Sequence, residues 1–141
     1  MRFVVAVFLV IPEIVHPLTS AKAVETNVAA FGINCQGSLK CDGQPRDTAA
    51  CLRDYIVNGI NVDGSYDNGK HIACQNNICA FLQSEKGPLD GGTIQSVAPA
   101  IVDHGCTACG SVPTSPGNNV EDGQLTFNYV DIPACENSLC N

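Results

Sequence analysis

The chain has 141 residues, a length that fits one domain. Nine of these residues are cysteines, and so high a share in a short chain is typical of domains that disulfides stabilise in an oxidising compartment. The 14 acidic and 7 basic residues give a formal net charge of −7, which argues against binding to nucleic acids or to anionic lipid surfaces.

The N-terminus is typical of a secretory signal peptide. Arg2 precedes an apolar run from Phe3 to Ile11, which is too short to span a bilayer. An alanine, a lysine and a second alanine then end at Ala23, as at a signal-peptidase cleavage site. We therefore expect residues 1–23 to be a signal peptide. Residues 24–141 would then form one secreted domain with 5 basic and 13 acidic residues, a net charge of −8 and no membrane anchor.

The first part of this domain is expected to hold a short strand followed by a helix. The apolar residues within 29–34 predict the strand. Asp47 is a residue type that caps helices, and apolar residues recur at helical spacing after it, so residues 48–57 are expected to be a helix. Gly59, with the asparagine before it, would end this helix.

The central segment is expected to contain a loop and a β-hairpin. Residues 61–69 include several aspartates and asparagines, but their spacing does not fit a calcium-binding loop, so a hydrated turn is expected. Residues 71–74 and 78–83 predict two strands on either side of a tight turn at residues 76–77.

The last part of the domain is expected to hold a second helix and a further strand. Apolar residues at helical spacing predict a helix over residues 94–104, with Thr93 as its cap and Gly105 after its end. Pro99 lies inside this pattern and is expected to kink or shorten the helix. Alternating apolar and polar side chains predict a strand over residues 124–130.

Cys106 and Cys109 form a Cys-x-x-Cys pair, which occurs in redox centres, in zinc sites and at disulfide anchor points. A redox centre of the thioredoxin type lies at the start of a helix, whereas this pair follows one. A zinc site needs four ligands, and the sequence offers no second pair; His71 and His104 are expected to be structural or exposed. The composition therefore favours two disulfides.

Another closely spaced pair, Cys35 and Cys41, is available as the partner of Cys106 and Cys109. Two bridges between the pairs would each close a loop of about 70 residues and stabilise the fold by roughly 4 kcal/mol. At this point either connectivity between the two pairs is open.

The other five cysteines allow fewer arrangements. Cys74 and Cys79 lie opposite each other if the turn between the two strands has two residues, so a bridge across the hairpin is open to them. Because nine is an odd number, at least one of Cys51, Cys135 and Cys140 should lack an intramolecular partner if the other bridges form. Cys51 is expected to be a buried thiol in the first helix. Cys140, near the terminus, is the alternative and could instead join two chains.

Signals for catalysis are weak in this sequence. No G-x-S-x-G motif occurs, nothing marks a Cys-His dyad, and the carboxylates are scattered through the predicted loops. We therefore expect no enzymatic activity, no cofactor and no metal. A small secreted enzyme is kept as an alternative, which a deep pocket with convergent carboxylates or histidines would support.

Four segments, taken in order, resemble the fungal killer-toxin family of the Kp4 type, whose founder is a virus-encoded toxin of a smut fungus. The resemblance extends over residues 31–135, nearly the whole secreted domain. The segments are FGINCQG (31–37), HIAC with ICAFLQ (71–74 and 78–83), IVDHGCTACGSVP (101–113) and GNNVEDGQLTFNYV (117–130).

The resemblance implies a fold and two bridges. The fold is an α+β, two-layer sandwich, in which an antiparallel sheet carries two antiparallel helices on one face. The bridges are Cys35–Cys106 and Cys41–Cys109, which would make the Cys-x-x-Cys pair a set of disulfide anchor points.

The resemblance also implies a functionally important lysine two residues before the hairpin cysteine. Here that position is Ile72. Lys70 is the nearest cation, and two residues back on one strand it is expected to lie on the same face, so Lys70 is the candidate toxin-active residue. The founder is basic whereas this chain is acidic. This difference in charge weakens the expectation that this chain interferes with calcium uptake, which is the action attributed to the founder.

We therefore expect a secreted toxin-like protein that binds a surface target, such as a calcium channel, on fungal or plant cells. The alternative within the family is a plant-directed effector, or virulence factor, without antifungal action.

Overall fold

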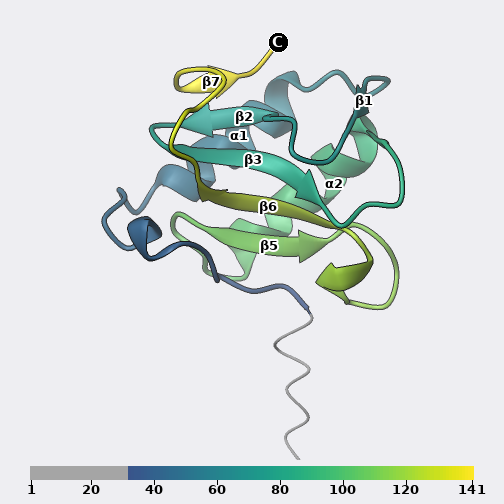
Figure 1. The fold of residues 1–141 in the computed structure, drawn as a ribbon, viewed down its shortest axis with the longest axis horizontal. Coiled ribbons are helices and arrows are strands. Elements are labelled where there is room, and N and C mark those ends of the chain that lie inside the picture. The colour runs from purple at the N-terminus through teal and green to yellow at the C-terminus, as the bar shows by residue number, and fades with distance from the viewer. Residues whose placement is uncertain (1–31) are drawn as a thin grey trace, which may run out of the picture.

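The computed structural model describes residues 32–141 (Figure 1). The signal peptide expected at residues 1–23 lies outside these residues, as does the first half of the strand expected at residues 29–34. In the described part of that strand, Asn34 forms an antiparallel bridge with Ser111. Its N–H donates to the carbonyl of Ser111 (3.1 Å), and the N–H of Ser111 donates back to the carbonyl of Asn34 (2.8 Å).

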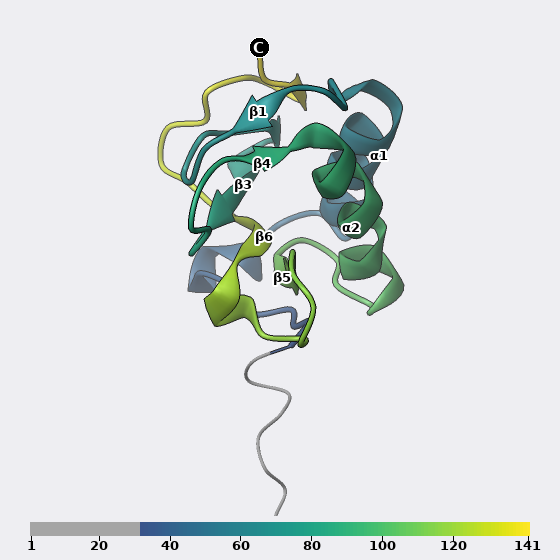
Figure 2. The ribbon, with the colours of Figure 1, turned by 90° about the vertical axis from the view of Figure 1, so that its right-hand side faces the viewer.

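The described residues form two layers, a five-stranded antiparallel sheet and two helices that cover one of its faces (Figure 2). The sheet has the strand order β5-β6-β3-β2-β7, and β1 pairs with β4 in a separate two-stranded sheet. The expected α+β sandwich is therefore confirmed. The elements are α1 (Thr48–Gly59), β1 (Ser65–Tyr66), β2 (Ala73–Gln75), β3 (Ile78–Gln83), β4 (Leu89–Asp90), α2 (Gly91–Asp103), β5 (Gly110–Pro113), β6 (Gln124–Tyr129) and β7 (Ser138–Leu139).

The hydrophobic core lies between the helices and the larger sheet. Both helices turn a stripe of apolar residues toward the sheet, at spacings of three, four and seven residues, which is the pattern of a helix with one buried face. Burial of these side chains is the main favourable term in folding. The fully buried core side chains are Ala49, Leu52 and Ile56 of α1, Ile94, Ala98 and Ile101 of α2, and Ala73, Ile78, Ala80, Leu82, Leu125 and Phe127 of the sheet.

The first helix is confirmed, but its expected cap is not. α1 runs from Thr48 to Gly59 and covers the whole of residues 48–57. Asp47 precedes the helix, yet its side chain makes no capping hydrogen bond. Its backbone dihedrals (φ −96°, ψ 0°) differ from the extended conformation in which a capping side chain reaches the first turn.

The second helix begins earlier than expected, at Gly91. Asp90, not Thr93, is the capping residue, because the Asp90 carboxylate accepts a hydrogen bond from the N–H of Thr93 (2.8 Å). The first residue of the helix has to be a glycine, because a Cβ atom on Gly91 would lie 2.0 Å from the carbonyl oxygen of Asn61. The helix also continues through Pro99 to Asp103, so the expected shortening is wrong.

The hairpin has the expected register. Cys74 pairs with Cys79 across β2 and β3, and Asn76 in the turn has a left-handed backbone (φ 53°), a conformation that asparagine tolerates better than most residues. The N–H of Asn76 donates to Oδ1 of Asn137 (2.8 Å), which ties the turn to the C-terminal segment.

Four disulfides connect the described residues. Two of them join distant segments, Cys35–Cys106 and Cys41–Cys109, which are the pairs that the resemblance implies. Two others close short loops, Cys74–Cys79 across the hairpin and Cys135–Cys140 near the C-terminus. Cys51 is the cysteine without a partner.

Candidate functional site

Lys70 lies in the turn that leads from β1 to β2, not on the strand itself. Its N–H donates to the carbonyl of Asp67 (3.3 Å), and β2 begins only at Ala73. The side chain of Lys70 is exposed, whereas Ile72 is 1% exposed and belongs to the core. The expectation that Lys70 shares a strand face with residue 72 is therefore wrong, because the turn ends the alternation of side chains before Lys70 is reached.

The ammonium group of Lys70 lies over an aromatic ring. Its Nζ is 5.5 Å from the centroid of Tyr66, within the range of a cation–π interaction. Tyr66 belongs to β1, which pairs with β4 and thereby holds the ring beside the turn. Sequence reasoning missed this tyrosine, because β1 has only two residues and lies inside a segment that reads as a loop.

Lys70 is one of the cations of the described residues that have no ion pair. Of the five lysines and arginines within residues 32–141, Lys40 pairs with Asp131 (3.1 Å) and Arg53 with Asp54 (2.8 Å). The other three form no salt bridge; apart from Lys70 they are Arg46 and Lys86. In a strongly acidic chain, an unpaired and exposed lysine is free to meet an anionic group of a partner.

A shallow pocket of about 300 Å³ adjoins Lys70 and Tyr66. Its other walls are Gly59 at the end of α1, the residues 60–61 and 64–65 that follow it, and residues 139–141. Leu139 packs against Gly59 so closely that a Cβ atom there would lie 2.6 Å from Cδ1 of the leucine. The cation, the aromatic ring and the pocket thus lie on one face, which suits contact with another protein.

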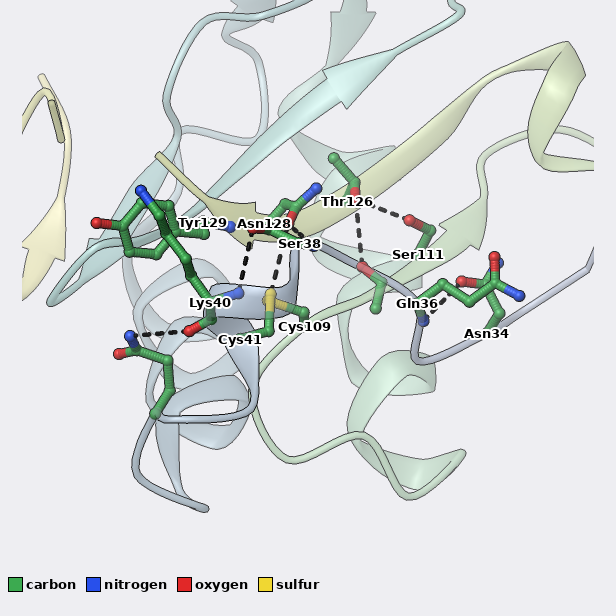
Figure 3. The surroundings of a disulfide bond; sticks show 12 residues. Asn34, Gln36, Ser38, Lys40, Cys41, Cys109, Ser111, Thr126, Asn128 and Tyr129 are labelled. Atoms are coloured by element: carbon green, nitrogen blue, oxygen red, sulfur yellow. Dashed lines mark hydrogen bonds between the residues drawn. A yellow bond between two sulfur atoms is a disulfide. The ribbon is translucent and has the colours of Figure 1, made fainter. Parts of the chain in front are cut away.

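A second lysine over an aromatic ring, Lys40, has a different role (Figure 3). Its Nζ lies 4.5 Å from the centroid of Tyr129 and is bonded to Asp131, and this hydrogen bond is the main reason that the pKa of Lys40 is raised above its ordinary value. Asn128 supports the same segment, since its Oδ1 accepts from the N–H of Ser38 (2.9 Å). Lys40 is therefore compensated in place and serves to anchor its segment.

The structure decides between the three interpretations of Cys106 and Cys109. Each is bonded to a distant cysteine, so neither is available for a redox pair or a metal. Sulfur atoms also gather elsewhere, where Cys74, Cys135 and Cys140 lie within 4.8 Å of one another. Because these three sulfurs are in disulfides, they lack the thiolate form that binds metals.

Cys51 is a free thiol on α1, and it is half-buried rather than fully buried. Burial raises the pKa of this thiol, and the nearby carboxylates of Asp47 and Asp54 raise it further. A raised pKa keeps the thiol protonated near neutral pH, and the protonated form is a poor nucleophile. This arrangement does not support catalysis by Cys51.

Comparison with known proteins places this geometry in a family. The family model described as Kp4 matches residues 18–131, most of the chain. The chain belongs to the Kp4 family. The KP4 killer toxin of Ustilago maydis P4 virus is 32% identical to this Kp4 chain over 121 residues, which cover 84% of the chain and 95% of the toxin. The family resemblance drawn from the four sequence segments is thus confirmed.

In this Kp4 chain, Ile72 stands where the family resemblance implies a lysine. Since Ile72 is packed in the core, a lysine at that position would have to bury a charge or alter the local backbone. The cation that this Kp4 chain presents nearby is Lys70, from the turn. Among the described residues, no helix is long and apolar enough to cross a membrane.

Proposed function

We propose that this Kp4 chain is a secreted toxin that binds a target on the surface of other cells and thereby inhibits calcium uptake. The observation that carries the proposal is the match to the Kp4 family over residues 18–131 together with 32% identity to a killer toxin. A toxin-like function follows from that membership. Kp4 is not known as a family of enzymes, which supports action by binding rather than by catalysis.

Lys70 and Tyr66 form the contact surface in this proposal. The lysine is exposed and lacks an ion pair, and the adjoining pocket of about 300 Å³ offers room for a side chain of the target. A carboxylate of the target would meet the ammonium group of Lys70, while the ring of Tyr66 packs beside it. The negative charge of the rest of the chain would confine an acidic target to this face.

A plant-directed effector without antifungal action is the second candidate. The observations that favour it are the acidic composition, with 14 acidic against 7 basic residues, and the isoleucine at position 72. The acidic composition and the isoleucine each change the charge that this chain would present to a target of the killer toxin. The two candidates share the fold and the bridges and differ in the cells that respond.

The deciding experiment applies the purified, oxidised protein to fungal cells and to plant tissue side by side, with and without added calcium. Slower fungal growth that millimolar calcium relieves is the expected result. A response of plant tissue alone would favour the effector. Growth inhibition that calcium leaves unchanged would overturn the calcium-uptake mechanism while leaving family membership intact.

Replacing Lys70 tests the contact surface. Lys70→Ala should raise the concentration needed for half-maximal inhibition by about tenfold, because loss of one central contact costs roughly 1–2 kcal/mol of binding free energy. Lys86→Ala is the matched control, since Lys86 is also exposed and free of ion pairs but has no aromatic ring beneath it. Full activity of Lys70→Ala would remove this surface from the proposal.

A further inference from the structure

The two disulfides that close short loops are in contact with each other. Sγ of Cys74 lies 3.7 Å from Sγ of Cys140, although Cys74 is bonded to Cys79 and Cys140 to Cys135. Neither sulfur carries a hydrogen, so this is a van der Waals contact between two intact disulfides. Once one of the two bonds has been opened to a thiolate, a contact of this length lets that thiolate attack the other bond without a large movement of the backbone.

The pairing of the strands brings this contact about. β7 pairs with β2 so that Ser138 lies opposite Cys74. The N–H of Cys140 then donates to the carbonyl of Ile72 (2.8 Å), which continues the pairing beyond the strand. Because side chains alternate along a strand, Cys140 lies on the same face as Ser138 and therefore on the face of Cys74.

The two bridges differ in their access to solvent. Cys74 and Cys79 are both 0% exposed, whereas Cys135 and Cys140 are only half-buried. A small thiol in solution therefore meets the Cys135–Cys140 bridge first. We call Cys135–Cys140 the outer bridge and Cys74–Cys79 the inner bridge. The link between them is Cys140, which belongs to the outer bridge and whose sulfur contacts that of Cys74.

We infer that these two bridges form a thiol–disulfide exchange site whose substrate is a small monothiol of the glutathione class. The external thiolate attacks Sγ of Cys135, forms a mixed disulfide with it and releases Cys140 as a thiolate. This thiolate attacks Sγ of Cys74, forms a Cys74–Cys140 disulfide and releases Cys79 as a thiolate, which takes a proton from solvent. Each step replaces one disulfide by another, so no separate oxidant or reductant is required.

The exchange changes what the C-terminal segment is attached to. Before it, Cys140 is bonded within its own loop, five residues away in the sequence. After it, the segment is covalently joined to β2, and the thiol of Cys79 is left on β3. The imidazole of His71, which lies within 4.8 Å of the sulfurs of Cys74 and Cys79, is the polar ring beside the leaving sulfur. This chemistry is independent of the proposed toxin function.

Disulfide mapping tests the exchange directly. The oxidised chain is incubated with reduced glutathione, thiols are trapped with iodoacetamide at intervals, and the product is cut after lysine, arginine and glutamate. These cuts separate residues 71–85, 122–136 and 137–141. At first 122–136 is joined to 137–141. The expected product joins 71–85 to 137–141, with Cys79 alkylated and Cys135 carrying glutathione.

Two variants make the result specific. In Cys135→Ser/Cys140→Ser, which lacks the outer bridge, Cys79 should become alkylated about tenfold more slowly at the same glutathione concentration. Cys51→Ser, which removes the free thiol of α1, should exchange like the native chain. The inference fails if peptides 71–85 and 137–141 are never joined while Cys135 and Cys140 become alkylated. It also fails if the double variant opens its inner bridge as fast as the native chain, or if exchange requires Cys51.

Discussion

Asp90 ends β4 and caps α2 with a single carboxylate. Oδ1 accepts from the N–H of Thr93 and Oδ2 from the hydroxyl of Thr93, both at 2.8 Å. These hydrogen bonds lower the pKa of Asp90 below its ordinary value of 3.8, because they stabilise the charged form. The cap of α2 is therefore sensitive to acid.

Replacing Asp90 by asparagine keeps an oxygen that accepts the N–H of Thr93 but removes the titration. Because the folded pKa lies below 3.8, the carboxylate stabilises the folded chain above that pH, and this contribution is lost as the pH falls through the folded pKa. The free energy of unfolding should thus fall more steeply with acid in the native chain than in Asp90→Asn. Thermal unfolding over a series of pH values measures both slopes, and equal slopes would contradict the role given to Asp90.

At the scale of the elements, α1 is held by its buried stripe rather than by a cap. Leu52→Ala should lower the free energy of unfolding by about 2–5 kcal/mol, because Leu52 is 0% exposed and its loss leaves a cavity against the sheet. Val57→Ala, on the exposed face of the same helix, should change it by about 0.5 kcal/mol or less. Denaturant unfolding of both variants is the measurement, and similar losses would show that the helix does not pack as described.

The elements that sequence reasoning predicted are those with a long periodic pattern. α1, α2, β3 and β6 each carry enough apolar residues at one spacing to be identified without the structure, and the short strand β2 is identified from the tight turn that joins it to β3. The elements that it missed are short: β1, β4 and β7 have two residues each, and β5 has four. Such strands exist because neighbours pair with them, and pairing between distant segments leaves no local pattern.

The candidate site was harder to predict than the fold for a related reason. Lys70 could be named from the sequence, but only tertiary contacts bring Tyr66 beside it and Leu139 to the same pocket. The buried side chain of Thr126 shows the same limit. Thr126 is one of the polar residues in the alternation of β6, and yet it is buried. Its hydroxyl forms a hydrogen bond with that of Ser111 (2.7 Å; Figure 3), which satisfies the buried polar group.

At the scale of the whole molecule, the four bridges divide into two kinds. Cys35–Cys106 closes a loop with a sequence separation of 71 residues and Cys41–Cys109 one of 68, whereas each of the other two closes a loop with a separation of 5. A longer loop restricts the unfolded chain more strongly. The two long bridges both end in the segment between α2 and β5. They therefore fix residues 35–41 to the point where the helix layer meets the sheet.

Removing bridges of the two kinds should have unequal effects. Cys35→Ala/Cys106→Ala should lower the free energy of unfolding by roughly 4 kcal/mol, and Cys135→Ala/Cys140→Ala by about 2 kcal/mol, because loop-closure entropy grows with loop length. Denaturant titration without reducing agent compares the two variants with the native chain. Equal losses would show that local packing, rather than chain entropy, sets the contribution of each bridge.

The two long bridges also decide what happens when the backbone is cut. The exposed turn at residues 67–70 lies between Cys41 and Cys106, and exposed turns are preferred sites of proteolytic cutting. A single cut in that stretch would not release a fragment, because Cys35–Cys106 and Cys41–Cys109 hold the pieces on both sides of it. The cut chain would stay one covalent molecule and give separate fragments only after its disulfides are reduced. A cut in an exposed turn would therefore leave the two pieces together.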